Sequence, residues 1–214
     1  TLVASLQYEN LGLLGSNCGI GDVDEVARLN HLCNQVGVDT IETGAAIGVA
    51  MEAGLIPFGD AKGAMDLVRQ IGQGTPLGRV LGSGVVVTGR VFGVRCVPAV
   101  KGQAIPAYDP RSLKGIGVTY ATSPQGADHT AGNALEMAKT LDQKKPEGQV
   151  AASLRLQVRG ALLDSLGVCL FIRPAFAKNP DLIARLLNAR YGWSLTFADV
   201  RQMGLRCLEM ERDF

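Results

Sequence analysis

The 214-residue sequence has few aromatic residues, few histidines and no excess of charge. Aromatic residues make up 5% of the chain and hydrophobic residues 47%, so the core must be built mainly from Ala, Val, Leu and Ile. The 21 basic and 20 acidic residues leave a net charge of +1, which gives no electrostatic case for binding nucleic acid or an anionic membrane. No apolar run reaches the roughly 18 to 20 residues that a membrane span needs.

Several motifs of nucleotide and metal enzymes are also missing. The early glycines match neither GxxxxGK[ST] nor GxGxxG after a strand, so a nucleotide-binding enzyme is unsupported. The sequence shows no recognisable Ser/His/Asp catalytic pattern, and its two histidines are too few to favour a metal site built from histidines. The five cysteines are widely spaced, odd in number and contain no CxxC pair. They predict reduced thiols and a cytoplasmic protein, not a disulfide scaffold.

The two ends of the chain look cut. The sequence starts at Thr1 without an initiator Met or the pattern of a signal peptide, and it ends at Phe214 in a helical pattern. We therefore expect a fragment of a longer protein.

Helix boundaries in the first half are marked by polar N-caps and by glycines. Asp22 precedes apolar residues at helical spacing, and Gly37 is a natural stop for that helix. Asp39, Asp60 and Thr75 begin three further helices in the same way. The stretch through residue 20 is rich in Gly and Asn and is expected to be a loop.

The remaining pattern is helical as well. Residues 85–87 could form a strand by β-propensity, but their surroundings favour a helix. A long apolar helix is expected from Gln149 to Leu163, one capped at Asn179 and a last one capped at Thr196. The sequence therefore predicts an all-α, multihelical fold.

Two prolines and a glycine break the helical periodicity within residues 99–111. This break predicts two helical subdomains, residues 1–98 and residues 99–214.

A single cysteine ends the hexapeptide Asp164-Ser165-Leu166-Gly167-Val168-Cys169. One thiolate cannot hold a cubane cluster, which takes four. Cys169 is therefore either an inert buried thiol, as free cysteines often are, or the last ligand of a site whose other ligands lie elsewhere. The hexapeptide alone does not decide between them.

A similar arrangement occurs earlier, in Asn34-Gln35-Val36-Gly37-Val38-Asp39. In both, a polar residue stands three positions before a glycine at which a helix ends. Such an amide or carboxylate can hydrogen-bond the ring nitrogens of a heterocycle, and the turn N–H groups can face an anion. Two such turns would suit a ligand with two similar halves, although a polar residue before a helix-ending glycine is also common without any ligand.

Two further residues are candidates for acid–base chemistry. His129 lies in a polar loop beside Asp128, where it is either a general acid or base or an ordinary exposed histidine. Glu9 precedes a Gly-rich stretch and, taken alone, is an ordinary surface carboxylate. His31 lies between apolar positions of a helix and is expected to pack.

Five separated strings together resemble the aldehyde:ferredoxin oxidoreductase family. In chain order they are YENLG (8–12), CNQVGVDTI (33–41), YDPR (108–111), YATSPQGADH (120–129) and the hexapeptide at 164–169. Members of that family are tungsten, sometimes molybdenum, enzymes with a bis-pyranopterin cofactor and one 4Fe-4S cluster. The resemblance implies an enzyme that oxidises aldehydes to carboxylates and passes two electrons through the cluster to ferredoxin or another carrier.

The resemblance also implies roles for particular residues. The two glycine turns would be the paired pterin-binding motifs, DxxGL(C/D). The matching positions are Asn34, Gly37, Val38 and Asp39 in the first motif, and Asp164, Gly167, Val168 and Cys169 in the second. Val replaces Leu in both, and Asn replaces the leading Asp of the first, which removes a charge. Cys169 would be the fourth cluster ligand, and Glu9 and His129 would assist proton transfer near the metal and the substrate.

Part of the family pattern is not in this sequence. The other three cluster cysteines form a CxxCxxxC run upstream of the Tyr-Glu string, and an N-terminal β domain cradles the cofactor. The chain thus resembles the two C-terminal helical domains of the family, and we expect these domains to be inactive alone. For the parent protein, the resemblance implies an aldehyde-type substrate and a homodimer. The alternatives are the same cofactor acting on a thioester or an aromatic ring, and a non-catalytic helical scaffold or interaction domain.

Overall fold

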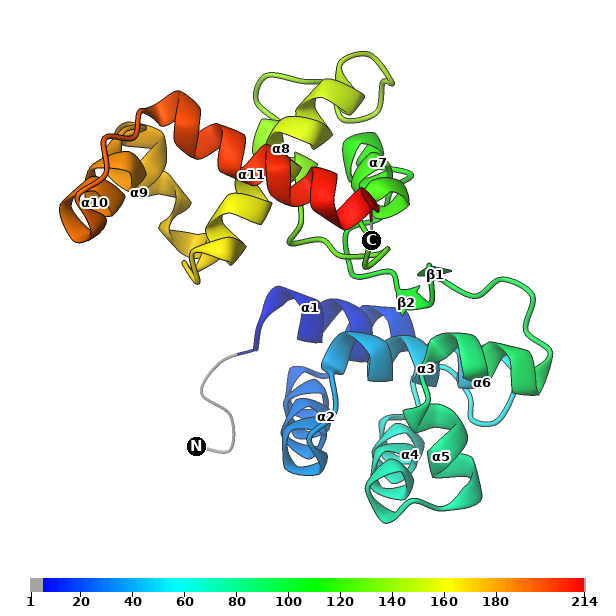
Figure 1. The fold of residues 1–214 in the computed structure, drawn as a ribbon. Coiled ribbons are helices and arrows are strands. Elements are labelled where there is room, and N and C mark those ends of the chain that lie inside the picture. Colours follow the sequence, from blue (N-terminus) through cyan, green and yellow to red (C-terminus); the bar gives the residue numbers. More distant parts are fainter. Residues whose placement is uncertain (1–5, 214) are drawn as a thin grey trace. The chain divides into compact units, whose positions relative to one another are not determined.

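The structure, a computed structural model, describes residues 6–213 (Figure 1). The predicted all-α class is confirmed, because helices make up most of the described chain. The one sheet within residues 6–213 is a pair of antiparallel two-residue strands, β1 (Ala99–Val100) and β2 (Gln103–Ala104). None of the helices in this range is both long and apolar enough to cross a membrane.

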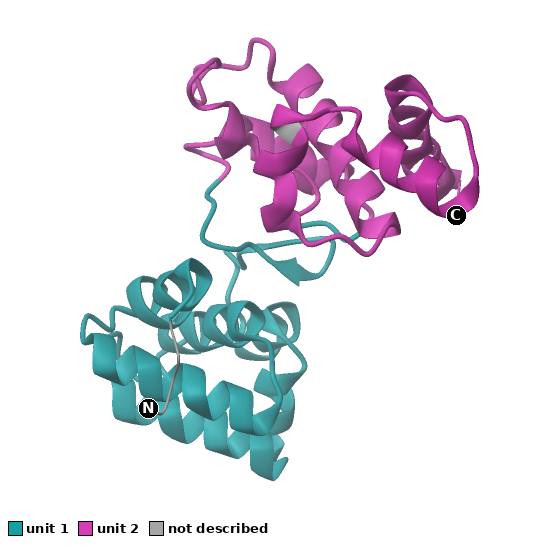
Figure 2. Ribbon diagram, turned by 90° about the vertical axis from the view of Figure 1, so that its left-hand side faces the viewer, with its two compact units in different colours: residues 1–109, 125–127 teal, residues 110–124, 128–214 magenta. Residues whose placement is uncertain are grey.

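The chain folds into two compact units (Figure 2). Unit 1 takes in residues up to 109 together with 125–127, and unit 2 takes in 110–124 and the chain from 128 onward. The predicted subdomains, residues 1–98 and 99–214, were defined from the sequence, whereas these two units are defined by how the residues pack. The predicted division therefore stays a prediction.

Unit 1 is built from six helices and two shorter helical turns within the described residues. They are α1 (Tyr8–Asn10), a π-helical stretch (Leu11–Gly15), a 3-10 turn (Ser16–Cys18), α2 (Val23–Val36), α3 (Thr40–Glu52), α4 (Ala61–Gln73), α5 (Pro76–Gly82) and α6 (Val85–Phe92). Residues 85–87 are therefore helical, as favoured.

The predicted N-caps of unit 1 are confirmed. The Asp22 carboxylate accepts from two backbone N–H groups of the first turn of α2. Asp39 accepts from the third residue of α3 at 2.7 Å, Asp60 from α4 at 2.9 Å and Thr75 from α5 at 3.0 Å. These side chains satisfy N–H groups that a helix start leaves unpaired, which is why the boundaries are legible in the sequence.

The expected loop before residue 20 is wrong for residues 8–18, which are helical; residues 1–5 lie outside the described part of the chain. The glycines here serve close packing, not turns. A Cβ added at Gly12 would lie 2.5 Å from the Cβ of Ala107, and one at Gly15 would lie 3.2 Å from Val26. Leu14, between them, is fully buried.

Helix α3 forms the centre of unit 1. Every residue from 43 to 51 is buried, which follows from its run of small and apolar side chains. A Cβ added at Gly44 would lie 2.7 Å from the backbone of Leu13, so the two segments pack at backbone distance. Ile47 and Leu14 belong to one apolar cluster, which binds α3 to the N-terminal helical turns.

Unit 2 consists of five helices and two 3-10 turns within residues 110–213. They are α7 (Lys114–Thr122), a 3-10 turn (Ala134–Met137), α8 (Gln149–Ser165), a 3-10 turn (Leu170–Ile172), α9 (Arg173–Lys178), α10 (Leu182–Tyr191) and α11 (Phe197–Asp213). Helix α8 is the long apolar helix that the sequence predicted.

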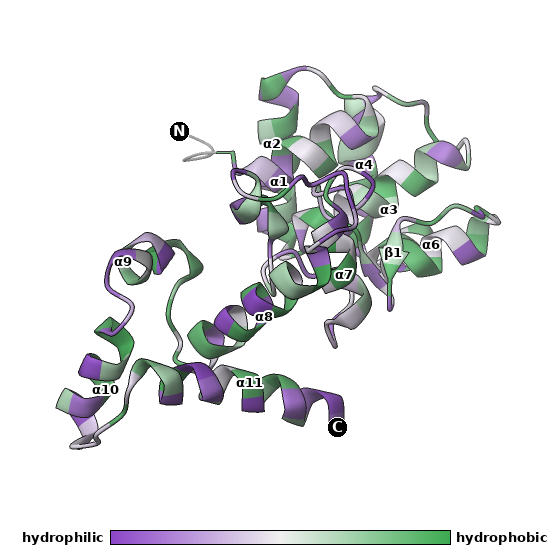
Figure 3. Ribbon diagram, turned by 90° about the horizontal axis from the view of Figure 1, so that it is seen from above, coloured by the Kyte–Doolittle hydropathy of each residue, from purple (hydrophilic) through white to green (hydrophobic). Residues whose placement is uncertain are grey.

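Helix α11 packs along α8. A Cβ added at Gly204 would lie 2.2 Å from the carbonyl oxygen of Val158, so only glycine permits this approach. Hydrophobic and hydrophilic residues alternate along α11 (Figure 3), and Val200 and Gly204 are its buried residues. The predicted cap is confirmed, because Thr196 Oγ1 accepts from the N–H of Asp199 at 3.3 Å.

The cap expected at Asn179 is wrong. Asn179 ends α9, a helix that the sequence analysis did not predict. Its backbone carbonyl, and not its side chain, accepts from the N–H of Leu182 at 3.0 Å. Pro174 in the first turn of α9 is compatible with a helix start, where the missing N–H has no helical partner.

Candidate functional site

Two glycine turns, one in each unit, have nearly the same backbone conformation. Gly37 ends α2 with φ +80°, and Gly167 follows α8 with φ +63°. The next residue in each turn donates its N–H to the carbonyl five residues earlier, at 3.0 Å for Val38 and 2.9 Å for Val168. This is the bonding pattern of the Schellman motif, in which a left-handed residue closes the helix.

The polar residue three positions before each glycine lies in the last turn of its helix. Asn34 and Asp164 are both exposed, so both side chains are accessible to a bound group. Partial burial raises the pKa of the Asp164 carboxyl, and the negative charge of Asp128 raises this pKa further. The loop that carries Asp128 therefore lies near the second turn within unit 2.

The residue after each valine is extended and precedes a new helix. Asp39 has φ −65° and ψ 135°, and Cys169 has φ −56° and ψ 133°. The Asp39 carboxylate accepts the N–H of Glu42 at 2.7 Å and so caps α3. Cys169 precedes only the three-residue turn Leu170–Ile172, and its exposed side chain makes no capping bond.

Both turns are open at the glycine. A Cβ added at Gly37 or at Gly167 would meet nothing within 4 Å. By contrast, a Cβ at Gly126 would lie 2.2 Å from the carbonyl oxygen of Val100, in space that the protein already fills. Gly54, Gly93, Gly102 and Gly192 are equally open, so open space permits a planar ring to approach the two turns but is not peculiar to them.

Glu9 lies in α1, half-buried, and is fixed by the segment at residue 107. Its Oε2 accepts the N–H of Ala107 at 2.8 Å, and the hydroxyl of Tyr8 donates to the carbonyl of Ala107 at 2.8 Å. The rings of Tyr8 and Tyr108 are 5.1 Å apart between centroids. Two strings that lie about a hundred residues apart in the sequence thus meet in unit 1.

His129 is half-buried in the loop that follows Asp128. The Asp128 carboxylate accepts both the N–H and the hydroxyl of Thr130, at 2.8 and 2.7 Å, which fixes the backbone around His129. Because Asp128 also acts on Asp164, the histidine loop and the second glycine turn are neighbours in unit 2.

The cysteines differ sharply in exposure. Cys18 and Cys33 are buried, and burial raises their pKa to about 11 and about 12 respectively, with the charge of Asp39 adding to the effect on Cys33. Cys96 and Cys169 are exposed. The burial expected for Cys169 as an inert thiol is therefore wrong, and its role as a ligand stays a prediction.

Within residues 6–213, no three His, Cys, Asp or Glu side chains are placed to hold one metal ion. The exposed thiol of Cys169 fits one position of a four-thiolate site but not the whole of it.

Sequence reasoning missed the structural role of Glu42. Glu42 lies three residues after the N-cap Asp39, but its carboxylate bonds to distant backbone groups. Its Oε1 accepts the N–H of Val85 at 2.8 Å and its Oε2 accepts the N–H of Ala104 at 2.9 Å. Glu42 thus ties α3 to the start of α6 and to β2, and no local sequence signal announces contacts of such long range.

Comparisons with known proteins identify the family. Residues 2–214 match the family described as aldehyde ferredoxin oxidoreductase, domains 2 and 3. The chain is 29% identical over 229 residues to the tungsten-containing aldehyde ferredoxin oxidoreductase of Pyrococcus furiosus and 30% identical over 231 residues to that of Pyrococcus abyssi. Each match covers 97% of this chain and 38% of the relative.

A more distant relative has a different name. The chain is 27% identical over 228 residues to an aliphatic sulfonate oxidoreductase, WOR-like subunit, of Pyrococcus furiosus. This match covers 96% of this chain and 34% of that protein. The chain thus spans well under half the length of the curated relatives it matches. Since the family match extends over nearly every residue, the chain belongs to the aldehyde ferredoxin oxidoreductase family, as a representative of its domains 2 and 3.

Proposed function

We propose that this chain is the helical part of a tungsten-pterin enzyme that oxidises aldehydes to carboxylates. The pair of open glycine turns, one of which ends in an exposed cysteine, is the observation that most supports the proposal. The overall reaction converts an aldehyde and water to a carboxylic acid, two protons and two electrons. When bound, the metal–pterin group supplies the two-electron redox centre, and molybdenum would serve the same role.

The residues of each turn fit one half of a bis-pterin group. In the first turn, the Asn34 amide offers donors and an acceptor to a pterin edge, while Asp39 continues to cap α3. In the second turn, Asp164 offers carboxylate oxygens and, because its pKa is raised, retains a proton to higher pH than an ordinary aspartate does. Gly37 and Gly167 leave the space beside each turn open.

Cys169 is proposed as one of the four thiolates of a 4Fe-4S cluster. Its exposure suits a ligand that reaches out of this chain. The other three thiolates belong to a CxxCxxxC segment that this sequence does not contain, so we propose that the 214-residue chain alone binds no cluster and is inactive.

Glu9 and His129 are proposed to handle protons. The N–H of Ala107 donates to Glu9 Oε2 and fixes the orientation of the carboxylate, which would act as the proton acceptor. His129 would take up a proton at a ring nitrogen as water adds to the aldehyde carbonyl carbon. The bonds between Asp128 and Thr130 keep the histidine loop in place.

The test uses a polypeptide in which this sequence is joined to the β domain and the CxxCxxxC segment of the family. Aldehyde-dependent reduction of a viologen dye reports activity, and iron, sulfide and tungsten analyses report cofactor content. Cys169→Ser should lower iron and sulfide content, whereas the matched exposed-thiol variant Cys96→Ser should not. Glu9→Gln and His129→Asn should lower kcat by roughly 10²–10⁴-fold at unchanged metal content.

Full cluster content and activity in Cys169→Ser would refute the ligand role. Stoichiometric iron or tungsten in the isolated 214-residue chain would refute its proposed inability to bind the cofactors.

The partners of such an enzyme follow from the reaction. We propose ferredoxin or another small carrier as the electron acceptor, the cytoplasm as the location and a homodimer as the assembly. Reduction of purified ferredoxin and the mass of the full-length protein in solution test the acceptor and the assembly.

A second substrate class remains a candidate because one relative is named for aliphatic sulfonates. The fold and the cofactor would be the same, with a sulfonate, a thioester or an aromatic ring as substrate. A panel of these compounds against aliphatic and aromatic aldehydes decides between them by kcat/KM. A protein that is fully metallated but turns over none of them would favour the non-catalytic scaffold.

A further inference from the structure

Unit 2 contains an apolar cavity of about 490 Å³, and none of residues 164–169 of the glycine turn is among its described lining residues. Its walls come from α8, α9, α10 and α11 and include the buried side chains of Leu156, Leu162, Ile183 and Val200. A volume of this size lies within the range of small-molecule sites, which are also mostly apolar.

The charged residues that line this cavity are all arginines: Arg155, Arg159, Arg173 and Arg201. No acidic side chain is among its described lining residues. The cavity therefore combines an apolar wall with charge of one sign.

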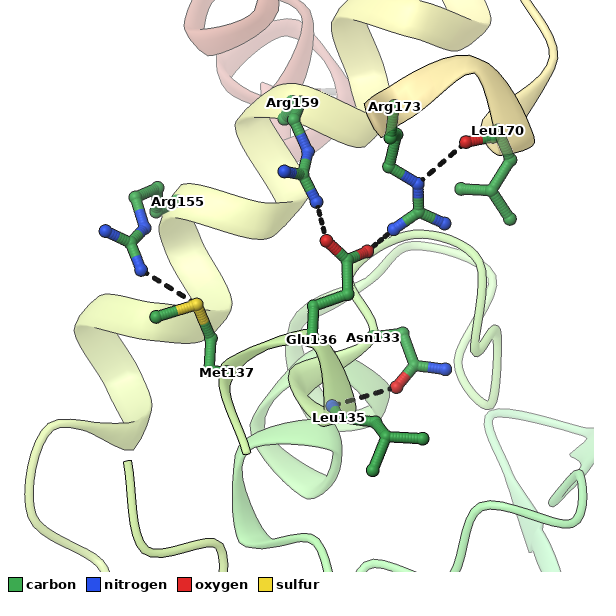
Figure 4. A network of polar contacts seen from close by, with 8 residues as sticks. All are labelled: Asn133, Leu135, Glu136, Met137, Arg155, Arg159, Leu170 and Arg173. Atoms are coloured by element: carbon green, nitrogen blue, oxygen red, sulfur yellow. Dashed lines mark hydrogen bonds and ion pairs between the residues drawn. The ribbon is translucent and has the colours of Figure 1, made fainter. Parts of the chain in front are cut away.

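Two of the four arginines form ion pairs with one nearby carboxylate (Figure 4). Glu136 forms ion pairs with both Arg159 and Arg173, one through each of its oxygens. Arg155 instead donates to the thioether sulfur of Met137 at 2.9 Å, which is a weak acceptor. Arg201 takes part in none of the ion pairs found among the residues that the structure describes.

Two of the arginines lie on the same helix. Arg155 and Arg159 are four residues apart on α8, and like charges at that spacing repel. Burial lowers the pKa of Arg159, which indicates that its guanidinium is partly removed from water. Guanidinium groups stay charged in proteins, so Arg155 and Arg201 offer fixed positive charge to an anion at the cavity.

We propose that the cavity binds an amphipathic organic anion, a small molecule with one carboxylate on an apolar chain or ring. The apolar part would lie against Leu156, Leu162 and Val200, and the carboxylate would be held by Arg155 and Arg201. Arginine suits this role because its planar group can bind both oxygens of a carboxylate. The inference does not depend on the redox function and would hold if that proposal failed.

The first test compares ligands of equal length and different charge on the unaltered 214-residue chain. Octanoate, octanol and octylammonium are titrated separately by calorimetry. Octanoate should bind at one site per chain and at least tenfold more tightly than either of the others. Equal binding of octanoate and octanol, or no binding of octanoate, would overturn the proposal.

The second test uses variants of the arginines. The double variant Arg155→Gln/Arg201→Gln should weaken octanoate binding at least tenfold, and Arg155→Lys/Arg201→Lys should recover part of it. Arg206→Gln, on α11 but outside this cavity, is the matched control and should bind octanoate normally. Circular dichroism establishes that each variant is folded, and an equal loss in Arg206→Gln would contradict the assignment.

A third measurement separates a free anion from a lipid surface. Vesicles of phosphatidylglycerol and phosphatidylcholine are sedimented with the chain. Co-sedimentation that Arg155→Gln/Arg201→Gln abolishes would show that the arginines serve a membrane, and the proposal of a free small-molecule ligand would be wrong.

Discussion

The two glycine turns share one backbone and differ in chemistry. Each closes a helix with a left-handed glycine and a valine that donates back into the helix. The first turn is flanked by the amide of Asn34 and the carboxylate of Asp39, whereas the second is flanked by the carboxylate of Asp164 and the thiol of Cys169. The positions that set the backbone are thus separate from those that set what the turn can bind.

The two turns also differ in the burial of their cysteines and in the element that the last residue of each turn begins. Cys33 immediately precedes Asn34 and is fully buried in the core of unit 1, whereas Cys169 ends the second turn and is exposed. Asp39 begins α3, the most buried helix of unit 1, while Cys169 begins only a three-residue turn. The second turn therefore carries a residue that the fold does not use, and a residue of that kind is available for ligand binding.

The largest expected difference between the turns is in thiol reactivity. At pH 8, Cys169 should react with a disulfide reagent at least about 100-fold faster than Cys33, because the thiolate is the reactive form and burial raises the pKa of Cys33 to about 12. Mass spectrometry of timed, quenched samples gives the rate at each cysteine. Exposed Cys96 is the control for accessibility and should react readily too.

Labelling of Cys33 at the rate of Cys169 in the folded protein would contradict the buried position of the first cysteine. In urea, both should react at similar rates, because unfolding removes the burial that separates them.

The same contrast shows what the sequence could predict. Helix starts at Asp22, Asp39 and Asp60 were legible because a polar N-cap acts on the next few residues, so its signal is local. The glycine ends of α2 and α8 were legible for the same reason. The exposure of Cys169 was not, because burial depends on which distant segments cover a residue.

The failures have the same physical cause. Glycine usually signals turns, so the sequence predicts a loop at residues 8–18, yet Gly12 is required by contact with Ala107, far along the chain. The bond between Glu9 and Ala107 and the effect of Asp128 on Asp164 also join remote segments. Within the candidate site, the turns follow from local sequence, and the neighbours of Glu9 and Asp164 do not.

A second prediction tests whether the two backbones are equivalent in energy. Gly37→Ala and Gly167→Ala should each lower the free energy of unfolding by about 1–2 kcal/mol, since a Cβ is disfavoured at left-handed φ. The two costs should be equal within error, because neither Cβ meets a neighbour within 4 Å. Urea denaturation followed by circular dichroism measures both.

The control for this pair is Gly21→Ala. Gly21 has equally open surroundings but is not in the left-handed region, so its replacement should cost little or stabilise slightly. A cost at one turn alone would mean that the two turns are not the same motif.

A third prediction concerns the residue after each valine. Asp39→Ala should cost about 1 kcal/mol, because the N–H of Glu42 loses its cap, and Asp39→Asn should recover most of it. Cys169→Ala should change stability by less than about 0.5 kcal/mol, since its side chain caps nothing. Urea denaturation checks this, and an equal cost at both positions would make Cys169 a structural residue.

The smallest expected effect distinguishes Asp164 from its counterpart Asn34. Burial and the charge of Asp128 raise the pKa of Asp164, so the native state holds this proton more tightly than the unfolded chain does. The carboxyl's stabilising contribution is then present below the ordinary aspartate pKa and is lost as pH rises through the raised native value.

Asp128→Asn should lower the pKa of Asp164, read by NMR titration of its carboxyl carbon, while Asp181→Asn should leave it unchanged. Asp164→Asn, which makes the second turn resemble the first, should slightly stabilise the protein at pH 7 and not at pH 3. A carboxyl carbon of Asp164 that titrates identically with and without Asp128 would show that the histidine loop does not act on this turn.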